Sequence, residues 1–131
     1  MQRASSSGPA MGRLLRSALA ATAVMNLVGC LAFTPLGDGL RSFVGIPAAH
    51  PLWPLTVGTF IGSMGLGYAA LAITARPERV FLGVAAIGKA SFALLLAAMW
   101  TAGEVGPLVA ATGVPDLVFA AIFARWLLAT R

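Results

Sequence analysis

The sequence predicts an all-α protein, a transmembrane four-helix bundle with both termini in the cytoplasm. The 131 residues are 59% hydrophobic and only 10% charged, with a mean hydropathy of +0.89, which is too apolar for a soluble domain. Four apolar runs of about 20 residues, the length of a membrane-spanning helix, alternate with segments rich in Gly, Pro or charge. Arginines gather in alternate connections, the pattern that sets orientation in a membrane.

The chain begins with a polar stretch, residues 1–12, whose small side chains offer nothing to bury. A disordered cytoplasmic tail is expected there. An apolar run then gives the first span, 14–33, with Arg13 and Arg16 at its start. The span is expected to end before Pro35, because the residue before a proline avoids the helical conformation.

The three connections differ in length and composition. The first, 34–52, is rich in Gly and Pro and contains one short amphipathic piece, 40–44. We expect a loop there with an interfacial turn on the membrane surface. The second connection, 76–79, is a tight charged turn, and the third, 101–104, is another short turn.

The second span, 54–74, is marked by small residues at helical spacing. Gly58 and Gly62 form a GxxxG pair, and Ser63 and Gly67 repeat the spacing. Such residues let helix backbones approach closely where lipid offers no hydrophobic drive for association. Two interpretations stay open, packing inside the bundle, which we favour, and a dedicated dimer face.

The third span, 80–100, carries Lys89 near its middle. An ammonium group at that depth costs about 2.5–3.5 kcal/mol on the insertion scale, so it requires a partner on a neighbouring helix or a wet cavity. Asp116, in the fourth span, is the acidic residue placed to serve as that partner.

The fourth span, 105–128, is interrupted by Pro115. Proline removes a backbone hydrogen bond and clashes with the preceding turn, so the helix is either kinked there or begins there. In the second case residues 105–112 form a re-entrant or interfacial piece and Asp116 caps a short helix. The kinked full span is the favoured interpretation.

Orientation follows from the basic residues, because loops rich in Lys and Arg stay in the cytoplasm. Most of them lie in the tail, in the second connection and at the C-terminus, namely Arg3, Arg13, Arg16, Arg76, Arg79, Arg125 and Arg131. Arg41 alone lies in a connection on the opposite side of the membrane, the first one. Trp53 and Trp100 then fall at the outer interface and Trp126 at the inner one, where amphipathic rings anchor helices.

With a kinked fourth span, each helix places one polar residue near the midplane, namely Asn26, Ser63, Lys89 and Asp116. A functional interpretation is a small polar pocket or relay. A structural interpretation is a buried Lys89–Asp116 pair, with Asn26 and Ser63 as hydrogen-bonding residues between helices. We favour the structural one, because an ion pair with two neutral groups is satisfied without a substrate.

The sequence contains no clear motif for a disulfide, a metal site, a catalytic centre or nucleic-acid binding. Cys30 is the single cysteine and His50 the single histidine, so neither an internal disulfide nor a metal site is expected. No pattern of a catalytic residue, such as a nucleophile with its base, is present, and the cofactor is left open. Residues 27–30 match a lipobox loosely, but the apolar run continues beyond them. The basic residues are scattered rather than gathered on one face, which disfavours nucleic-acid binding.

Several short motifs resemble those of small bacterial four-span integral membrane proteins of unknown function. The chain is also distantly similar in size and topology to the DoxX-like proteins. The resemblance covers spans two to four and implies a fold and no activity. The motifs are Gly65-x-Gly67-Tyr68, Gly88-Lys89, and Asp116 followed by Phe119, Phe123 and Trp126-Leu127.

For function we expect a non-catalytic subunit or partner-binding protein, multi-pass in a bacterial inner membrane. Its partners would be the lipid bilayer and another protein or a second copy of the chain. The alternative is a small oligomeric transporter or channel whose path is lined by Lys89 and Asp116. An enzyme acting on a lipid or quinone ranks third.

Overall fold

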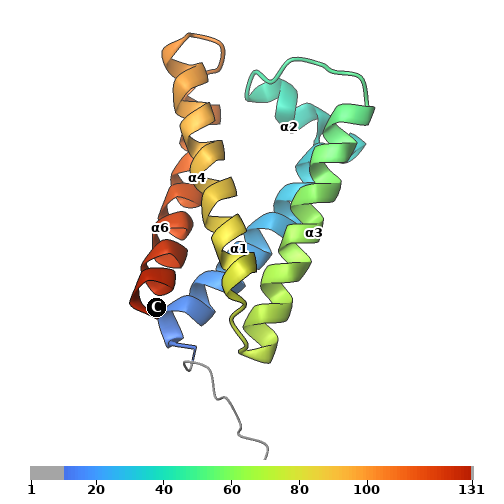
Figure 1. Ribbon diagram of the computed structural model, residues 1–131. Helices are drawn as coiled ribbons and strands as arrows, with labels where there is room; N and C mark the ends of the chain where they lie inside the picture. The colour runs from blue at the N-terminus through green and yellow to red at the C-terminus, as the bar shows by residue number, and fades with distance from the viewer. Residues whose placement is uncertain (1–10, 131) are drawn as a thin grey trace, which may run out of the picture.

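The computed structural model describes residues 11–130, and every regular element in that range is helical (Figure 1). Four helical segments are long and apolar enough to cross a membrane, which confirms the predicted helical class and the number of candidate spans. Residues 1–10 of the predicted tail, 1–12, lie outside the described residues. The elements are α1 (Arg13–Gly29), two 3₁₀ turns (Cys30–Phe33 and Pro35–Gly37), α2 (Asp38–Phe43), α3 (Leu52–Thr74), α4 (Arg79–Thr101), α5 (Pro107–Ala111) and α6 (Gly113–Ala129).

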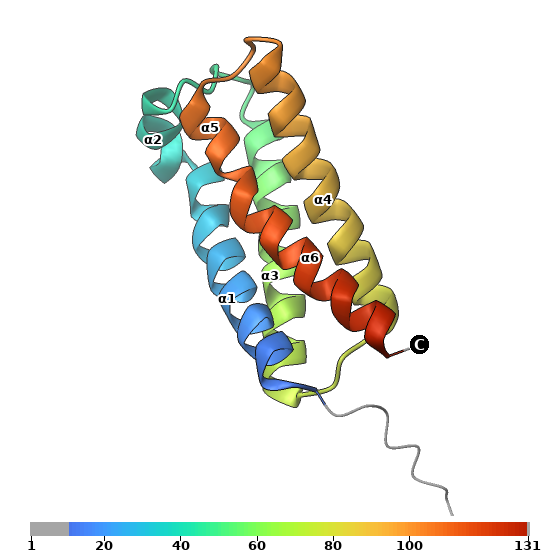
Figure 2. The same cartoon turned by 90° about the vertical axis from the view of Figure 1, so that its left-hand side faces the viewer.

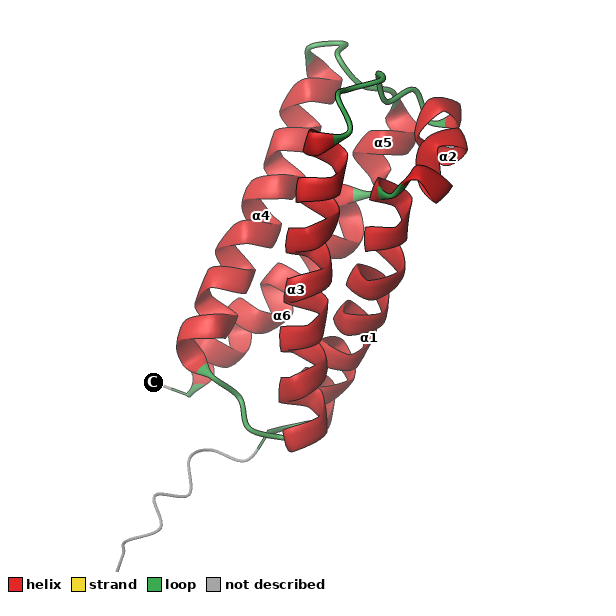
Figure 3. Ribbon diagram, turned by 90° about the vertical axis from the view of Figure 1, so that its right-hand side faces the viewer, coloured by secondary structure: helices red, strands yellow, loops and turns green. Residues whose placement is uncertain are grey.

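The long helices form two antiparallel pairs rather than a uniform bundle. In the first hairpin α1 packs along α3, and in the second α4 packs along α6, as Figures 2 and 3 show from two sides. Although α3 and α4 follow one another in the chain, no Cα atom of one lies within 8 Å of a Cα atom of the other. Between the hairpins, the backbones approach where α1 passes α6.

Glycines bring the helices of the first hairpin together. A Cβ atom added to Gly58 would lie 3.2 Å from the carbonyl oxygen of Cys30, and one added to Gly65 would lie 3.0 Å from Leu27 Cγ. Gly62 lies against Cys30 as well, and Gly67 faces Phe81 of α4 instead. These four glycines of α3 therefore serve contacts within this chain, where close approach favours van der Waals packing.

A single apolar core joins the two hairpins at the end of the molecule where α1 begins and α6 ends. Tyr68, Phe123, Leu19 and Leu82 are completely or almost completely buried there. Residues from α1, α3, α4 and α6 all contribute to this cluster. Figure 1 shows the two hairpins converging at this lower end and separating toward the upper one.

The fourth span is one apolar segment with a break. It comprises α5 and α6, and Thr112 lies between them. Thr112 donates both its amide, at 3.1 Å, and its hydroxyl, at 2.6 Å, to the Val109 carbonyl. Gly113 follows at the break, and a Cβ there would lie 3.1 Å from Ala93 Cα of α4. Helix α6 thus begins two residues before Pro115 and crosses close to α4.

Candidate functional site

The two intramembrane charges of the sequence meet in the second hairpin. Lys89 of α4 donates a hydrogen bond to the Asp116 carboxylate of α6, and the side chains are only 9% and 14% exposed, respectively. Removing one partner of a buried pair leaves an uncompensated charge, whereas the intact pair largely neutralises itself. The pair therefore supplies within the chain the partner that an intramembrane lysine requires.

The break at Thr112 helps to place the carboxylate. Asp116 lies in the first turn of α6, where the free amide groups of a helix N-terminus favour negative charge. A continuous helix from Pro107 would lack that terminus, because carbonyls of α5 would accept those amides. The position of Asp116 in the first turn of α6 is therefore one that suits a negative charge.

Aromatic rings surround the ammonium group. Lys89 Nζ lies 5.6 Å from the centre of the Tyr68 ring and 5.7 Å from that of Phe119, within cation–π range. Tyr68 in turn stacks on Phe123 at 5.9 Å between ring centres and meets the edge of Phe81 at 5.3 Å. We call these four rings the aromatic cluster. Tyr68 is its one member from the first hairpin, and it connects α3 to the ion pair.

The remaining two residues of the predicted polar cluster lie elsewhere. Asn26 of α1 donates to the Ile61 carbonyl of α3 at 3.4 Å, so it joins the helices of the first hairpin. Ser63 lies on an exposed side of α3 and donates to the Thr59 carbonyl of its own helix at 2.8 Å. The structure therefore brings together Lys89 and Asp116 and leaves Asn26 and Ser63 outside their hydrogen-bonding contacts.

Tyr68 and Phe119 contact Lys89, although the sequence singled them out only within motifs that resemble those of other small membrane proteins. A usable signal was present for Phe119, since it follows Asp116 by three residues and so lies on the same helix face. No comparable signal exists for Tyr68, because its contact with Lys89 depends on how the hairpins meet.

The tryptophans lie at the two ends of the molecule. Trp53 and Trp100 are 63% and 52% exposed near the upper end, whereas Trp126 is half-buried at the lower end. There Arg79 lies 5.8 Å above the Trp126 ring and donates to the Leu127 carbonyl at 3.0 Å. The start of α4 is thereby tied to the end of α6.

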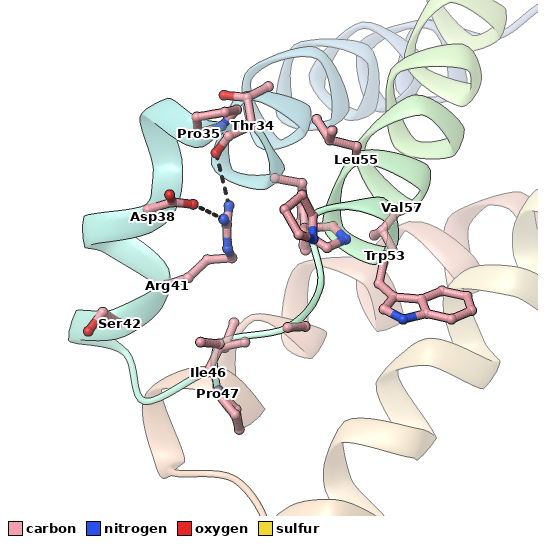
Figure 4. A pocket seen from close by; sticks show the side chains of 15 residues that line it. Thr34, Pro35, Asp38, Arg41, Ser42, Ile46, Pro47, Trp53, Leu55 and Val57 are labelled. Atoms are coloured by element: carbon pink, nitrogen blue, oxygen red, sulfur yellow. Dashed lines mark hydrogen bonds and ion pairs between the residues drawn. The ribbon is translucent and has the colours of Figure 1, made fainter.

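A pocket of about 540 Å³ opens at the upper end, between α2 and the start of α3 (Figure 4). Its polar wall is Arg41, which points toward Asp38 and Thr34 and is bonded to both. Neither Lys89 nor Asp116 lines this pocket. Within residues 11–130, no group of three or more His, Cys, Asp or Glu is placed to hold a metal ion.

Fold and site together define a multi-pass helical protein with four candidate membrane spans and an internal ion pair. Comparisons with protein-family models, with curated protein sequences and with solved structures gave no match. Function is therefore inferred from the geometry of the chain itself.

Proposed function

We propose that this chain is a non-catalytic subunit of a bacterial inner-membrane complex, which binds another protein or a second copy through its spans. The observation that carries this proposal is the closed ion pair. Lys89 is bonded to Asp116 and lies beside two aromatic rings. Neither charge is left without a partner, so the pair is satisfied within the fold and does not require a substrate.

A surface for association is available on α3. Small residues at helical spacing lie along one exposed side of this helix, namely Thr56, Thr59, Ser63, Ala70 and Thr74. Every hydroxyl among them donates to a carbonyl one turn earlier, so none is left unsatisfied in lipid. Small side chains let a second helix approach closely, which is one way helices associate in a bilayer, and the exposed side chains of Phe60 and Leu66 border this side.

The proposed orientation places both termini in the cytoplasm. It is supported by the arginines of the tail and of the connection after α3, since cytoplasmic loops carry the excess of basic residues. In a Cys30→Ser background, Gly39→Cys and Glu104→Cys should react with an impermeant thiol reagent in intact cells, whereas Glu78→Cys should react only after lysis. Labelling of Glu78→Cys in intact cells would overturn the orientation.

The association face is tested by site-specific photo-crosslinking in native membranes. A photoreactive side chain at Ser63 should give a discrete protein adduct. The matched control is Ile87, which is 71% exposed on α4 and should give lipid adducts alone. The same protein adduct should persist in the Lys89→Met, Asp116→Leu double variant. Lipid adducts alone at Ser63 would contradict a binding role for α3.

A transporter or channel is the second candidate function, and it is favoured by the residual exposure of Asp116, 14%. A path lined by the pair would require both charges. In proteoliposomes, ion flux present in the natural chain and abolished in the folded double variant would support transport. A double variant that retains any measured flux would exclude this role for the pair.

A further inference from the structure

The segment formed by the second 3₁₀ turn and α2 is held against the bundle by one side only. Gly37 is buried there, and a Cβ atom at this position would overlap the Ala32 carbonyl. Arg41 donates to the Ala32 and Thr34 carbonyls and pairs with Asp38. These contacts fix the rotation of α2 about its own axis.

With that rotation fixed, a second side of the segment is apolar and uncovered. Leu36, Leu40 and Phe43 are 88%, 56% and 80% exposed. Their spacing of four and three residues places them on one side of a helix. At 3.6 residues per turn this side is turned by roughly 100° from the one that contacts the bundle. Asp38 and Ser42, both exposed, lie on a third, polar side that borders the open pocket at the upper end.

The segment also lies where a membrane surface is expected. Figures 2 and 3 show α2 standing out from the side of the molecule beside the upper end of α1. Trp53 and Trp100, both more than half exposed, belong to the same end. Tryptophan is enriched at the headgroup level of membranes, so these two rings give the depth at which α2 would lie.

We propose that α2 is an interfacial helix that binds lipid at the boundary between headgroups and acyl chains. Leu36, Leu40 and Phe43 insert among the acyl chains, while Asp38 and Ser42 face water. Three sides, in contact with protein, lipid and water respectively, match the environment of a short helix lying beside a bundle in the membrane plane. This inference rests on the membrane location proposed above.

The experiment is a spin-label scan of the full-length protein in vesicles of phosphatidylcholine and phosphatidylglycerol. Single cysteines replace Leu36, Leu40, Phe43 and Ser42 in a Cys30→Ser background, and each carries a nitroxide. Collision rates with oxygen, which concentrates in lipid, and with a water-soluble nickel complex report the surroundings of each label. Because all four side chains are exposed, their replacement removes no packing.

We expect a several-fold higher ratio of oxygen to nickel collisions at Leu36, Leu40 and Phe43 than at Ser42. Equal ratios at all four positions, or low access to both reagents at the three apolar ones, would overturn the proposal. A label at Ile87 in the middle of α4 distinguishes failure of the interfacial-helix proposal from failure of the proposed membrane location. Lipid exposure at Ile87 without lipid exposure on α2 rejects the interfacial helix alone, whereas water exposure at Ile87 rejects the membrane location as well.

Discussion

The two hairpins are held together by different forces. In the first, three glycines of α3 lie against α1 and the following turn, where they meet Leu27, Cys30 and Phe33. In the second, α4 and α6 lie side by side just as extensively, and one ion pair with the rings beside it adds a charged contact near the middle of α4. Gly113 provides a point of close approach between α6 and α4.

This difference illustrates two solutions to one problem, because lipid supplies no hydrophobic drive for helices to associate. Steric fit spreads many small van der Waals terms over a long surface, so it is sensitive to added volume. An ion pair concentrates the energy in two side chains, so it is sensitive to loss of charge. Volume changes should therefore affect the first hairpin most, and charge changes the second.

The largest effect is expected from breaking the ion pair. Lys89→Met and Asp116→Leu should each lower the free energy of unfolding by about 3–5 kcal/mol, because each leaves one buried charge unpaired. The double variant should recover most of that loss. Thermal unfolding of the four proteins in mild detergent gives the coupling energy of the double-mutant cycle. Strictly additive losses would show that the two side chains do not interact.

Next in size is the loss of the ring that joins the hairpins. Tyr68→Leu should destabilise the protein by removing two aromatic pairs, each worth about 0.5–1.5 kcal/mol, together with the cation–π contact to Lys89. Tyr68→Phe keeps the ring and should unfold at nearly the temperature of the natural chain. If Tyr68→Phe were as damaging as Tyr68→Leu, the hydroxyl rather than the ring would be the important group.

A smaller effect is expected from adding one methyl group to the first hairpin. Gly58→Ala should cost about 1–3 kcal/mol, because the new Cβ would press on the Cys30 carbonyl and overpacking forces backbone shifts. Gly88→Ala is the matched control on α4, since its Cβ would meet nothing within 4 Å. Alanine there should be neutral or stabilising by up to about 1 kcal/mol. Equal losses at both positions would contradict steric fit as the basis of the first hairpin.

The smallest effect is expected at Cys30. Its thiol donates to the Leu27 carbonyl at 3.0 Å, and a serine hydroxyl makes the same local bond. Cys30→Ser should leave the melting temperature, membrane location and gel mobility unchanged. A larger, unprocessed product in the variant would instead identify residues 27–30 as a lipoprotein processing site.

The sequence predicted the parts of this structure that depend on composition along the chain. Hydropathy located the four spans to within two residues, and counting residues from the helix ends placed Lys89 and Asp116 at matching depth. The sequence could not predict which helices would pack against one another. Phe60, which is 70% exposed, and Leu71, which is 9% exposed, lie on the same apolar helix, so periodicity cannot distinguish the lipid side from the packed side.

Other features of the site were not predicted for the same reason, namely that the sequence does not give the rotation of each helix or its neighbours. Ser63 was grouped with the buried charges because depth was known and rotation about the helix axis was not. The contact of Tyr68 with Lys89 was not predicted, because it depends on how one hairpin crosses the other. For α2, the pattern of 40–44 indicated an amphipathic piece, but the folding of Arg41 onto the carbonyls of the preceding turn carries no sequence signature.

The separation of α3 from α4 has a consequence for how the protein is made. Since their backbones do not come close, the helix contacts within each hairpin do not depend on the other hairpin. The two halves would dock through α1 against α6, through Tyr68 against Phe81, and through the apolar core that all four long helices share. Two polypeptides divided between Arg76 and Pro77 would retain every one of these surfaces, so genes encoding the halves separately should complement one another in a single cell.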